Sequence, residues 1–188
     1  MDQVNYVLFG ESPYPRKESA NGYAFWDAAV NELWSPTGLS KRVNRATSLR
    51  NIIKMLLLAD GALKPNDTSQ EAIARLDKNK YYQTNTEFFQ NLLSHGFLLL
   101  NATPVLQDGA PQIDAKAWHA FTIEVLTSLL RKRPNVTLIL FGRIANVLKD
   151  FAPPTHLNKL ISEHPYNVSF ITNIEVLDFF RPLSLLNR

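Results

Sequence analysis

Short apolar runs of strand length alternate along the chain with stretches whose apolar residues recur at helical spacing. Residues 4–9, 97–101 and 136–141 predict buried strands, and residues 159–162 predict a weaker fourth strand. Buried strands separated by helices favour a parallel sheet covered on both faces. We therefore predict an α/β fold with three layers (α/β/α) and a central, mostly parallel four-stranded sheet. The length of 188 residues suggests one domain over residues 1–188.

The segments between these strands contain the predicted helices. The aromatic-rich segment 22–33 predicts a short helix, Thr47 or Ser48 is expected to cap a helix, and Asp114 is expected to cap a long helix through Arg131. Further helices are expected to open at 68–71, to span 87–94, to run through Lys149 after the third strand, and to start at Thr172 with a limit near Pro182. The long helix is expected to carry an apolar stripe of Trp118, Phe121, Val125 and Leu129.

Polar and aromatic residues follow directly after the predicted strands. In parallel sheets of this kind, ligands bind beyond the carboxyl ends of the strands. The segments that this rule nominates for a site are 10–14, 101–103, 142–143 and 164–168.

Residue types that the chain lacks exclude several kinds of chemistry. There is no cysteine, which excludes disulfides, thiolate zinc sites and cysteine nucleophiles, and makes a reducing cytoplasm the expected compartment. The four histidines, at positions 95, 119, 156 and 164, lack metal-ligand spacing, so no metal is expected. No apolar run approaches the ~20 residues of a membrane span, and the first residues do not read as a secretion signal.

Basic residues gather in one stretch of a chain whose net charge is +3. Residues 41–54 contain Lys41, Arg42, Arg45, Arg50 and Lys54 and no acidic residue. Such a stretch can follow a phosphate backbone, or it can be the solvated face of a helix.

The strand ends carry a set of motifs in a particular order: GESPY at 10–14, LLLNATPVL at 98–106, ILFG at 139–142 and HPYNVSF at 164–170. Together they resemble uracil-DNA glycosylases of the family whose first motif reads GQDPY. NGYAF at 21–25 is similar to the family's HGLAF, SLRNI at 48–52 to its SLENI, and Trp118 with Phe121-Thr122 to its W-x-x-FT helix. The resemblance implies a monomeric, monofunctional hydrolase that needs no cofactor and releases uracil, or a related deaminated base, from single- or double-stranded DNA.

The resemblance assigns base-binding roles to three residues. Asn101 would read the base, since a side-chain amide matches the N3 donor and O4 acceptor of uracil and opposes the reversed pattern of cytosine. Phe25 would stack on the extruded base, and Tyr14 would exclude the thymine methyl group by its bulk. The alternatives are a turn-forming Asn101, a core aromatic at Phe25 and a loop aromatic at Tyr14.

His164 matches the histidine of the family's HPSPLS motif, which donates a hydrogen bond to uracil O2 as charge develops there. Val168 matches the leucine that fills the space left by the flipped base, and Tyr166 and Asn167 replace its Ser-Pro. Ser48 and Arg143 are expected to contact DNA phosphates.

The first motif departs from the family at its aspartate, which positions the attacking water. Ser12 stands there, and Glu11 occupies the place of the family's glutamine. Another branch of the superfamily reads GEAPG, with a glutamate at this second position. Our hypothesis is that Glu11 supplies the catalytic carboxylate, with Ser12 beside it.

Three alternatives remain open. The chain could be a superfamily member that binds DNA with weak or no catalysis. It could be a hydrolase with Ser12 as nucleophile, although Tyr14 stands where a nucleophile elbow needs its second glycine. It could also be a nucleotide-binding or structural domain, although it has neither a P-loop nor a G-x-G-x-x-G motif.

Overall fold

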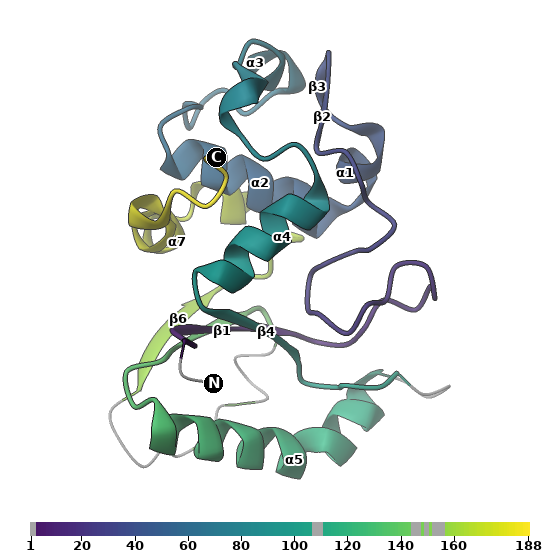
Figure 1. The fold of residues 1–188 in the computed structure, drawn as a ribbon, viewed down its shortest axis with the longest axis vertical. Coiled ribbons are helices and arrows are strands. Elements are labelled where there is room, and N and C mark those ends of the chain that lie inside the picture. The colour runs from purple at the N-terminus through teal and green to yellow at the C-terminus, as the bar shows by residue number, and fades with distance from the viewer. Residues whose placement is uncertain (1–2, 107–110, 144–147, 149–150, 152–156) are drawn as a thin grey trace. The chain divides into compact units, whose positions relative to one another are not determined.

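The computed structural model describes residues 3–106, 111–143, 148, 151 and 157–188. Its contacts divide the chain into two compact units (Figure 1). The sheet unit comprises Met1–Asp27 and Leu93–Ile161, and the helical unit comprises Ala28–Leu92 and Ser162–Arg188. The single domain predicted over 1–188 stays a prediction, and the helix expected through Lys149 falls on residues outside this description.

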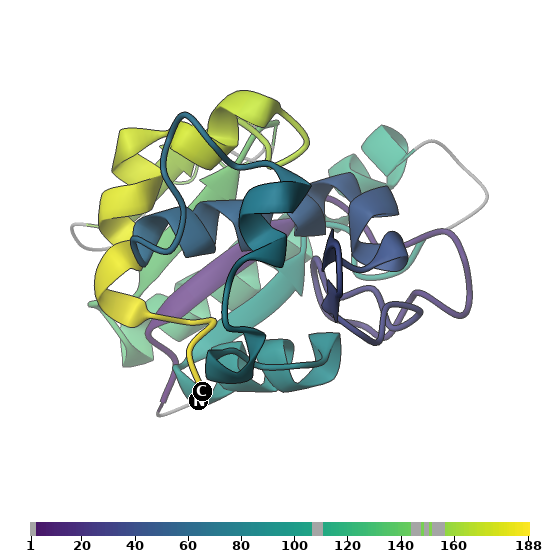
Figure 2. The same ribbon diagram turned by 90° about the horizontal axis from the view of Figure 1, so that it is seen from above.

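Four strands form the central sheet: β1 (Tyr6–Gly10), β4 (Phe97–Asn101), β5 (Thr137–Phe141) and β6 (Asn158–Ser162). They lie in the order β4-β1-β5-β6, with β1 parallel to both β4 and β5 (Figure 2). The four predicted strands and the parallel pairing are confirmed, to within two residues at each strand end.

Helix α5 (Pro111–Lys132) covers one face of the sheet. The core on this face consists of Val7, Phe9, Ala102, Leu126, Leu129, Leu130, Val136, Leu138, Leu140, Leu148 and Phe151. The strand residues of the opposite face, such as Leu8, Leu99 and Ile139, are buried as well. Burial on both sides explains why β1, β4 and β5 are continuous apolar runs rather than alternating ones.

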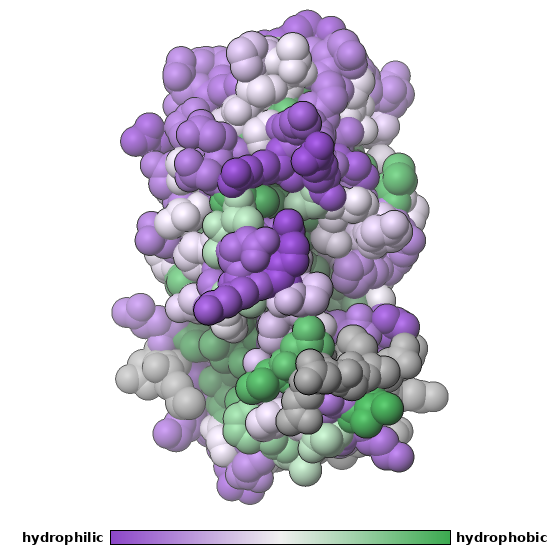
Figure 3. All heavy atoms as spheres, turned by 90° about the vertical axis from the view of Figure 1, so that its right-hand side faces the viewer, coloured by the Kyte–Doolittle hydropathy of each residue, from purple (hydrophilic) through white to green (hydrophobic). Residues whose placement is uncertain are grey.

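The stripe predicted for α5 is right at Leu129 and wrong at Phe121. Leu129 is buried and Trp118 and Val125 are half-buried, whereas Phe121 is 52% exposed and the adjacent Thr122 is buried instead. Asp114 does not cap the helix, because α5 already begins at Pro111, a residue that suits the first helical turn. Figure 3 shows the hydrophobic residues that remain at the surface in the lower part of the view. The exposed large apolar side chains of the sheet unit include Val105, Ile113 and Phe121.

The helical unit contains a short hairpin and a set of helices. These are β2 (Trp34–Ser35), β3 (Gly38–Leu39), α1 (Lys41–Arg45), α2 (Thr47–Ala59), α3 (Gln70–Ala74), the 3-10 helix η1 (Lys78–Lys80), α4 (Asn85–Ser94), η2 (Val168–Thr172), α7 (Ile174–Phe180) and η3 (Arg181–Leu183). Helix α2 contacts both η2 and α7, which brings residues 168–180 against it. Among the described residues, no helix is long and apolar enough to cross a membrane.

Several helix ends differ from the prediction. Segment 22–33 forms turns rather than a helix, because Gly22 (φ 88°) and Phe25 (φ 63°) are in the left-handed region. Neither Thr47 nor Ser48 caps α2, whose N-cap is Ala46 without a side-chain hydrogen bond.

The last helix also begins later than predicted. Thr172 ends η2, and Asn173 caps α7 by accepting a hydrogen bond from the Val176 N–H. Three of the predicted boundaries hold: Ser69 caps α3, α4 ends at Ser94, and Pro182 lies in η3, beyond the end of α7.

Asp60 generates a prediction for stability. It is the C-cap of α2, burial raises the pKa of its carboxyl to about 6, and its buried Oδ2 has no hydrogen-bond partner among the described residues. The folded chain therefore binds this proton more tightly than the unfolded chain, and stability falls as the pH rises from about 4 to about 6. We expect Asp60→Asn to raise the free energy of unfolding by about 1–2 kcal/mol at pH 8 and much less at pH 4, as measured by denaturant titration.

Asp67 offers a control of opposite sign, because hydrogen bonds from the side chain and backbone of Ser69 hold the pKa of its carboxyl below the usual value. Asp67→Asn should lower stability at pH 8 and lose this effect as the pH falls. If Asp60→Asn raises the free energy of unfolding equally at pH 4 and pH 8, the charge of Asp60 is not the cause of the stabilisation.

Candidate active site

The carboxyl ends of β1 and β4 bring the first motif beside the second. Gly10 and Asn101 are direct partners at the last position of the two strands. The pairing continues into the loops, where the Ala102 N–H donates to Gly10 O at 2.9 Å and the Thr103 N–H donates to Glu11 O at 3.1 Å. The loop that carries the predicted catalytic residues is thus fixed by main-chain hydrogen bonds.

The Asn101 side chain occupies space that Gly10 leaves empty. A Cβ atom on Gly10 would lie 2.4 Å from Asn101 Oδ1 and 2.9 Å from the Ala24 Cβ. Asn101 is only 7% exposed, and its Oδ1 lies in the space beside Gly10. A side-chain amide offers a donor beside an acceptor, which is suited to reading a polar ligand edge, the role that the sequence predicts for this residue.

Tyr14 and Phe25 are joined by a hydrogen bond. The Tyr14 hydroxyl donates to the Phe25 carbonyl at 3.2 Å. Burial, with a further contribution from the charge of Asp27, raises the pKa of Tyr14 to about 12, so the phenol keeps its proton. The bond holds a residue in a costly conformation, since Phe25 has a φ of 63°.

The Phe25 ring is half-buried and meets Phe141, at the end of β5, edge to face with ring centroids 6.3 Å apart. Its partly exposed ring lies next to Ala24, which contacts Gly10. The residues predicted to read, stack on and exclude bases therefore come together around one end of the sheet unit.

Glu11 and Arg143 form an ion pair across the ends of β1 and β5. Arg143 Nη2 lies 2.9 Å from Glu11 Oε1 and 3.1 Å from Oε2. Gly142 directs Arg143 toward this carboxylate through its φ of 63°. Ser12, the next residue after Glu11, is half-buried. The sequence nominated Glu11 and Arg143 for separate roles and did not predict their pairing.

In the helical unit, the loop that follows β6 fixes the protonation pattern of His164. The Tyr166 N–H donates to His164 Nδ1 at 3.1 Å, and the Asn167 N–H donates to His164 O at 2.9 Å. Because Nδ1 is an acceptor here, the proton of the neutral ring is on Nε2. His164 can therefore donate a hydrogen bond through Nε2 without carrying a positive charge.

Asn51 holds the same loop from helix α2. Its Nδ2 donates to Pro165 O at 2.7 Å and lies 3.5 Å and 3.4 Å from the carbonyl oxygens of Tyr166 and Asn167. Asn51 is 1% exposed, and its Oδ1 accepts from Arg50 Nε at 3.1 Å. Sequence reasoning missed this residue, although it is the fourth letter of the SLRNI motif.

The far end of the loop is anchored by Glu163 and Asn173. Burial opposes the charge of Glu163, but hydrogen bonds from its own backbone, Ser169 and Asn173 outweigh this effect and hold its pKa below the usual value. Asn173 Nδ2 donates to Glu163 Oε2 at 2.8 Å. Between these anchors, Tyr166 and Val168 are 67% and 71% exposed and Asn167 is exposed too. The loop thus presents apolar side chains to solvent from a fixed base.

The basic stretch 41–54 lies on α1 and α2. Lys41, Arg42 and Arg45 are exposed, whereas Arg50 and Lys54 are half-buried. Burial, and then the charge of Arg50, lowers the pKa of Lys54. No ion pair found among the described residues involves these five basic residues. Ser48, half-buried in the first turn of α2, belongs to the same stretch.

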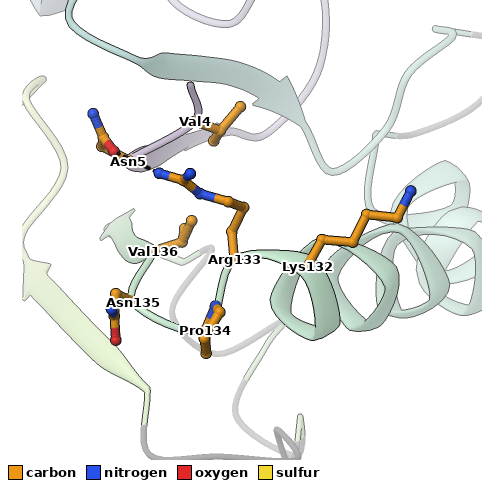
Figure 4. A pocket seen from close by; sticks show the side chains of 7 residues that line it. All are labelled: Val4, Asn5, Lys132, Arg133, Pro134, Asn135 and Val136. Atoms are coloured by element: carbon orange, nitrogen blue, oxygen red, sulfur yellow. Dashed lines mark hydrogen bonds between the residues drawn. The ribbon is translucent and has the colours of Figure 1, made fainter. Parts of the chain in front are cut away.

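A cavity of about 230 Å³ lies at the opposite, amino-terminal ends of β1 and β5 (Figure 4). It is lined by Val4, Asn5, Lys132, Arg133, Pro134, Asn135 and Val136. Arg133 points toward Asn5 and donates to its Oδ1 at 3.1 Å, whereas Lys132 points away. Basic residues are favourable at a helix C-terminus such as that of α5, which accounts for their presence here. In the described part of the chain, no group of three or more acidic or histidine side chains could hold a metal ion.

Comparisons with known proteins agree with the motifs. No protein-family model matches the chain. It is 26% identical over 167 residues to a uracil-DNA glycosylase of Chlamydia abortus and over 168 residues to one of Borreliella burgdorferi, covering 87% and 86% of this chain. The chain spans 59% of the length of these curated relatives.

Two solved structures extend the comparison. The wild-type UNG crystal structure from Nitratifractor salsuginis is 45% identical, with a TM-score of 0.93, and the match covers 100% of this chain and 75% of that one. Mimivirus uracil-DNA glycosylase, at 16% identity and a TM-score of 0.51, covers 87% of this chain and 50% of its own, and supports the fold alone.

The hydrogen bonds of Asn51 lead to a prediction for the loop after β6. Asn51→Ala removes the donor from the buried carbonyl of Pro165 and from the part-buried carbonyls of Tyr166 and Asn167, so the free energy of unfolding should fall by about 1–3 kcal/mol. Amide exchange of residues 165–168, measured by mass spectrometry, should become faster. Asn91→Ala is the matched control, because Asn91 Nδ2 donates to Leu185 O at 3.0 Å in the same unit. Equal acceleration in both variants would rule out a local role for Asn51.

Proposed function

Because the chain belongs to the uracil-DNA glycosylase superfamily, we propose that it hydrolyses the N-glycosidic bond of uracil, or of a related deaminated base, in DNA and leaves an abasic site. The observation that carries this proposal is the buried amide of Asn101, which lies against Gly10 at the ends of two paired parallel strands. Identity of 45% to a UNG over the whole chain supports it.

The base-reading step uses the three residues gathered in the sheet unit. The flipped base stacks on Phe25, and the Asn101 amide accepts from N3–H and donates to O4. Cytosine would oppose both hydrogen bonds, and each unpaired buried group costs about 1–3 kcal/mol. The Tyr14 ring, fixed through its hydroxyl, stands against the C5 position and excludes a methyl group.

The chemical step breaks the bond between the sugar C1′ and the base N1. The electron pair of this bond passes to uracil, and a water oxygen forms the new bond to C1′. The Glu11 carboxylate takes the proton of the water and stabilises the positive sugar, with Ser12 beside it as a neutral hydrogen-bonding group. His164 donates from Nε2 to uracil O2 as that oxygen becomes negative. The departing uracil anion then gains a proton, so no metal or organic cofactor takes part.

The remaining roles concern the DNA. Val168 fills the space left by the flipped base, and Tyr166 stacks on a neighbouring base with Asn167 beside it. Ser48 and Arg143 bind phosphates. We propose that the protein acts as a monomer on single- or double-stranded DNA, and in the cytoplasm, since the chain contains no cysteine.

The test of this proposal is uracil release from a single-stranded oligonucleotide. Glu11→Gln keeps the shape of the side chain and removes its charge, so kcat should fall by about 100-fold or more. Glu18→Gln is the matched control, because Glu18 is an exposed carboxylate of the same loop that lies 4.0 Å from Arg16. Equal rates for wild type and Glu11→Gln would remove Glu11 from the mechanism. Binding of uracil-containing DNA by the wild type without abasic sites would instead identify a DNA-binding protein.

Tyr14 offers a second prediction, because its ring and its hydroxyl have separable roles. Tyr14→Phe leaves the Phe25 carbonyl without its donor and should lower kcat/KM on uracil by about fivefold, while thymine stays excluded. Tyr14→Ala should also admit thymine, as measured by release from otherwise identical oligonucleotides. Thymine release by Tyr14→Phe would show that the ring alone is not the barrier.

A further inference from the structure

The ion pair between Glu11 and Arg143 occupies both side chains, although the proposed function gives Glu11 to the reacting sugar and Arg143 to a DNA phosphate. A carboxylate that stabilises a positive sugar acts through its negative charge, but one guanidinium nitrogen lies within 3.1 Å of both Glu11 oxygens. Among the ion pairs of the described residues, Glu11 is found only with Arg143, since Arg16 pairs with Glu18 and Asp27. In this state, the Glu11 carboxylate is paired with a positively charged guanidinium.

The Glu11–Arg143 ion pair lies at the surface, where a phosphate can replace Glu11 as the partner of Arg143. The Arg143 side chain is 69% exposed and that of Glu11 is 36% exposed. Ion pairs between exposed side chains are weak and are further screened by salt. A phosphate presents oxygens to a guanidinium in the same geometry as a carboxylate, and it can therefore take over Arg143.

We propose that Glu11 and a DNA phosphate compete for Arg143, so that binding of DNA releases the Glu11 carboxylate. Arg143 then acts first as a partner that neutralises Glu11 and afterwards as a phosphate ligand. This proposal rests on the proposed function in one respect: release of Glu11 affects catalysis only because Glu11 is the reacting carboxylate. The competition itself requires only that the protein binds DNA.

A double-mutant cycle of binding measures the competition. Affinity is determined for wild type, Glu11→Gln, Arg143→Gln and the double variant, with Glu18→Gln as the control for loss of one negative charge. Two oligonucleotides serve as probes, one with only ordinary bases and one with 2′-fluoro-deoxyuridine, whose fluorine slows bond cleavage by destabilising the sugar cation. Each titration is repeated over a range of salt concentrations.

Glu11→Gln should bind both probes about two- to fivefold more tightly than wild type, beyond any gain in Glu18→Gln, because Arg143 is released from its partner. This excess should vanish when Arg143 is already Gln. Arg143→Gln should reduce the salt dependence of binding by close to one phosphate contact.

The same gain from Glu11→Gln in both backgrounds, or an unchanged salt dependence in Arg143→Gln, would overturn the competition. If the proposed function is wrong, the result is different: the wild-type protein produces no abasic sites at any concentration. Binding of the oligonucleotide with only ordinary bases tests the competition whether or not the protein is active.

Discussion

The alignment of Gly10 with Asn101 at the ends of two neighbouring parallel strands is the constraint on which the candidate site depends. The absence of a side chain at Gly10 leaves space for the Asn101 amide and for Ala24. Ala24 is followed by Phe25, whose ring meets Phe141 at the end of β5. The ladder between β1 and β4 thus determines where Asn101 and the loop that carries Glu11 lie.

Much of the sheet could be predicted from the sequence, because β1, β4 and β5 are apolar runs that end at or before glycine or a polar residue. The face to which each strand residue points could not be predicted. Both faces of the sheet are buried, so Leu98, Leu99 and Leu100 look alike in sequence although Leu99 lies on the same face as Asn101. The stripe of α5 was wrong at Phe121 for a similar reason, since Phe121 and Thr122 are adjacent and only packing distinguishes them.

The parts of the site that sequence reasoning missed are contacts between distant segments. Asn51 and the carbonyls of residues 165–167 are more than 110 positions apart, and Glu11 and Arg143 are 132 positions apart. Local patterns carry no information about such pairs. The left-handed conformation of Phe25 was also missed, because tertiary contacts rather than residue preference impose it, among them the hydrogen bond from Tyr14.

The hold of Asn51 on the loop after His164 has a consequence for the energetics of association. A segment that becomes ordered only when it binds loses conformational entropy at that moment, which weakens the complex and slows its formation. The backbone of residues 165–167 is already held by the buried amide of Asn51, so the freedom lost on binding would come from the exposed side chains of the loop, chiefly the large ones of Tyr166 and Val168. Affinity for a nucleic acid would therefore respond more to the size of those two side chains than to the flexibility of the chain that bears them.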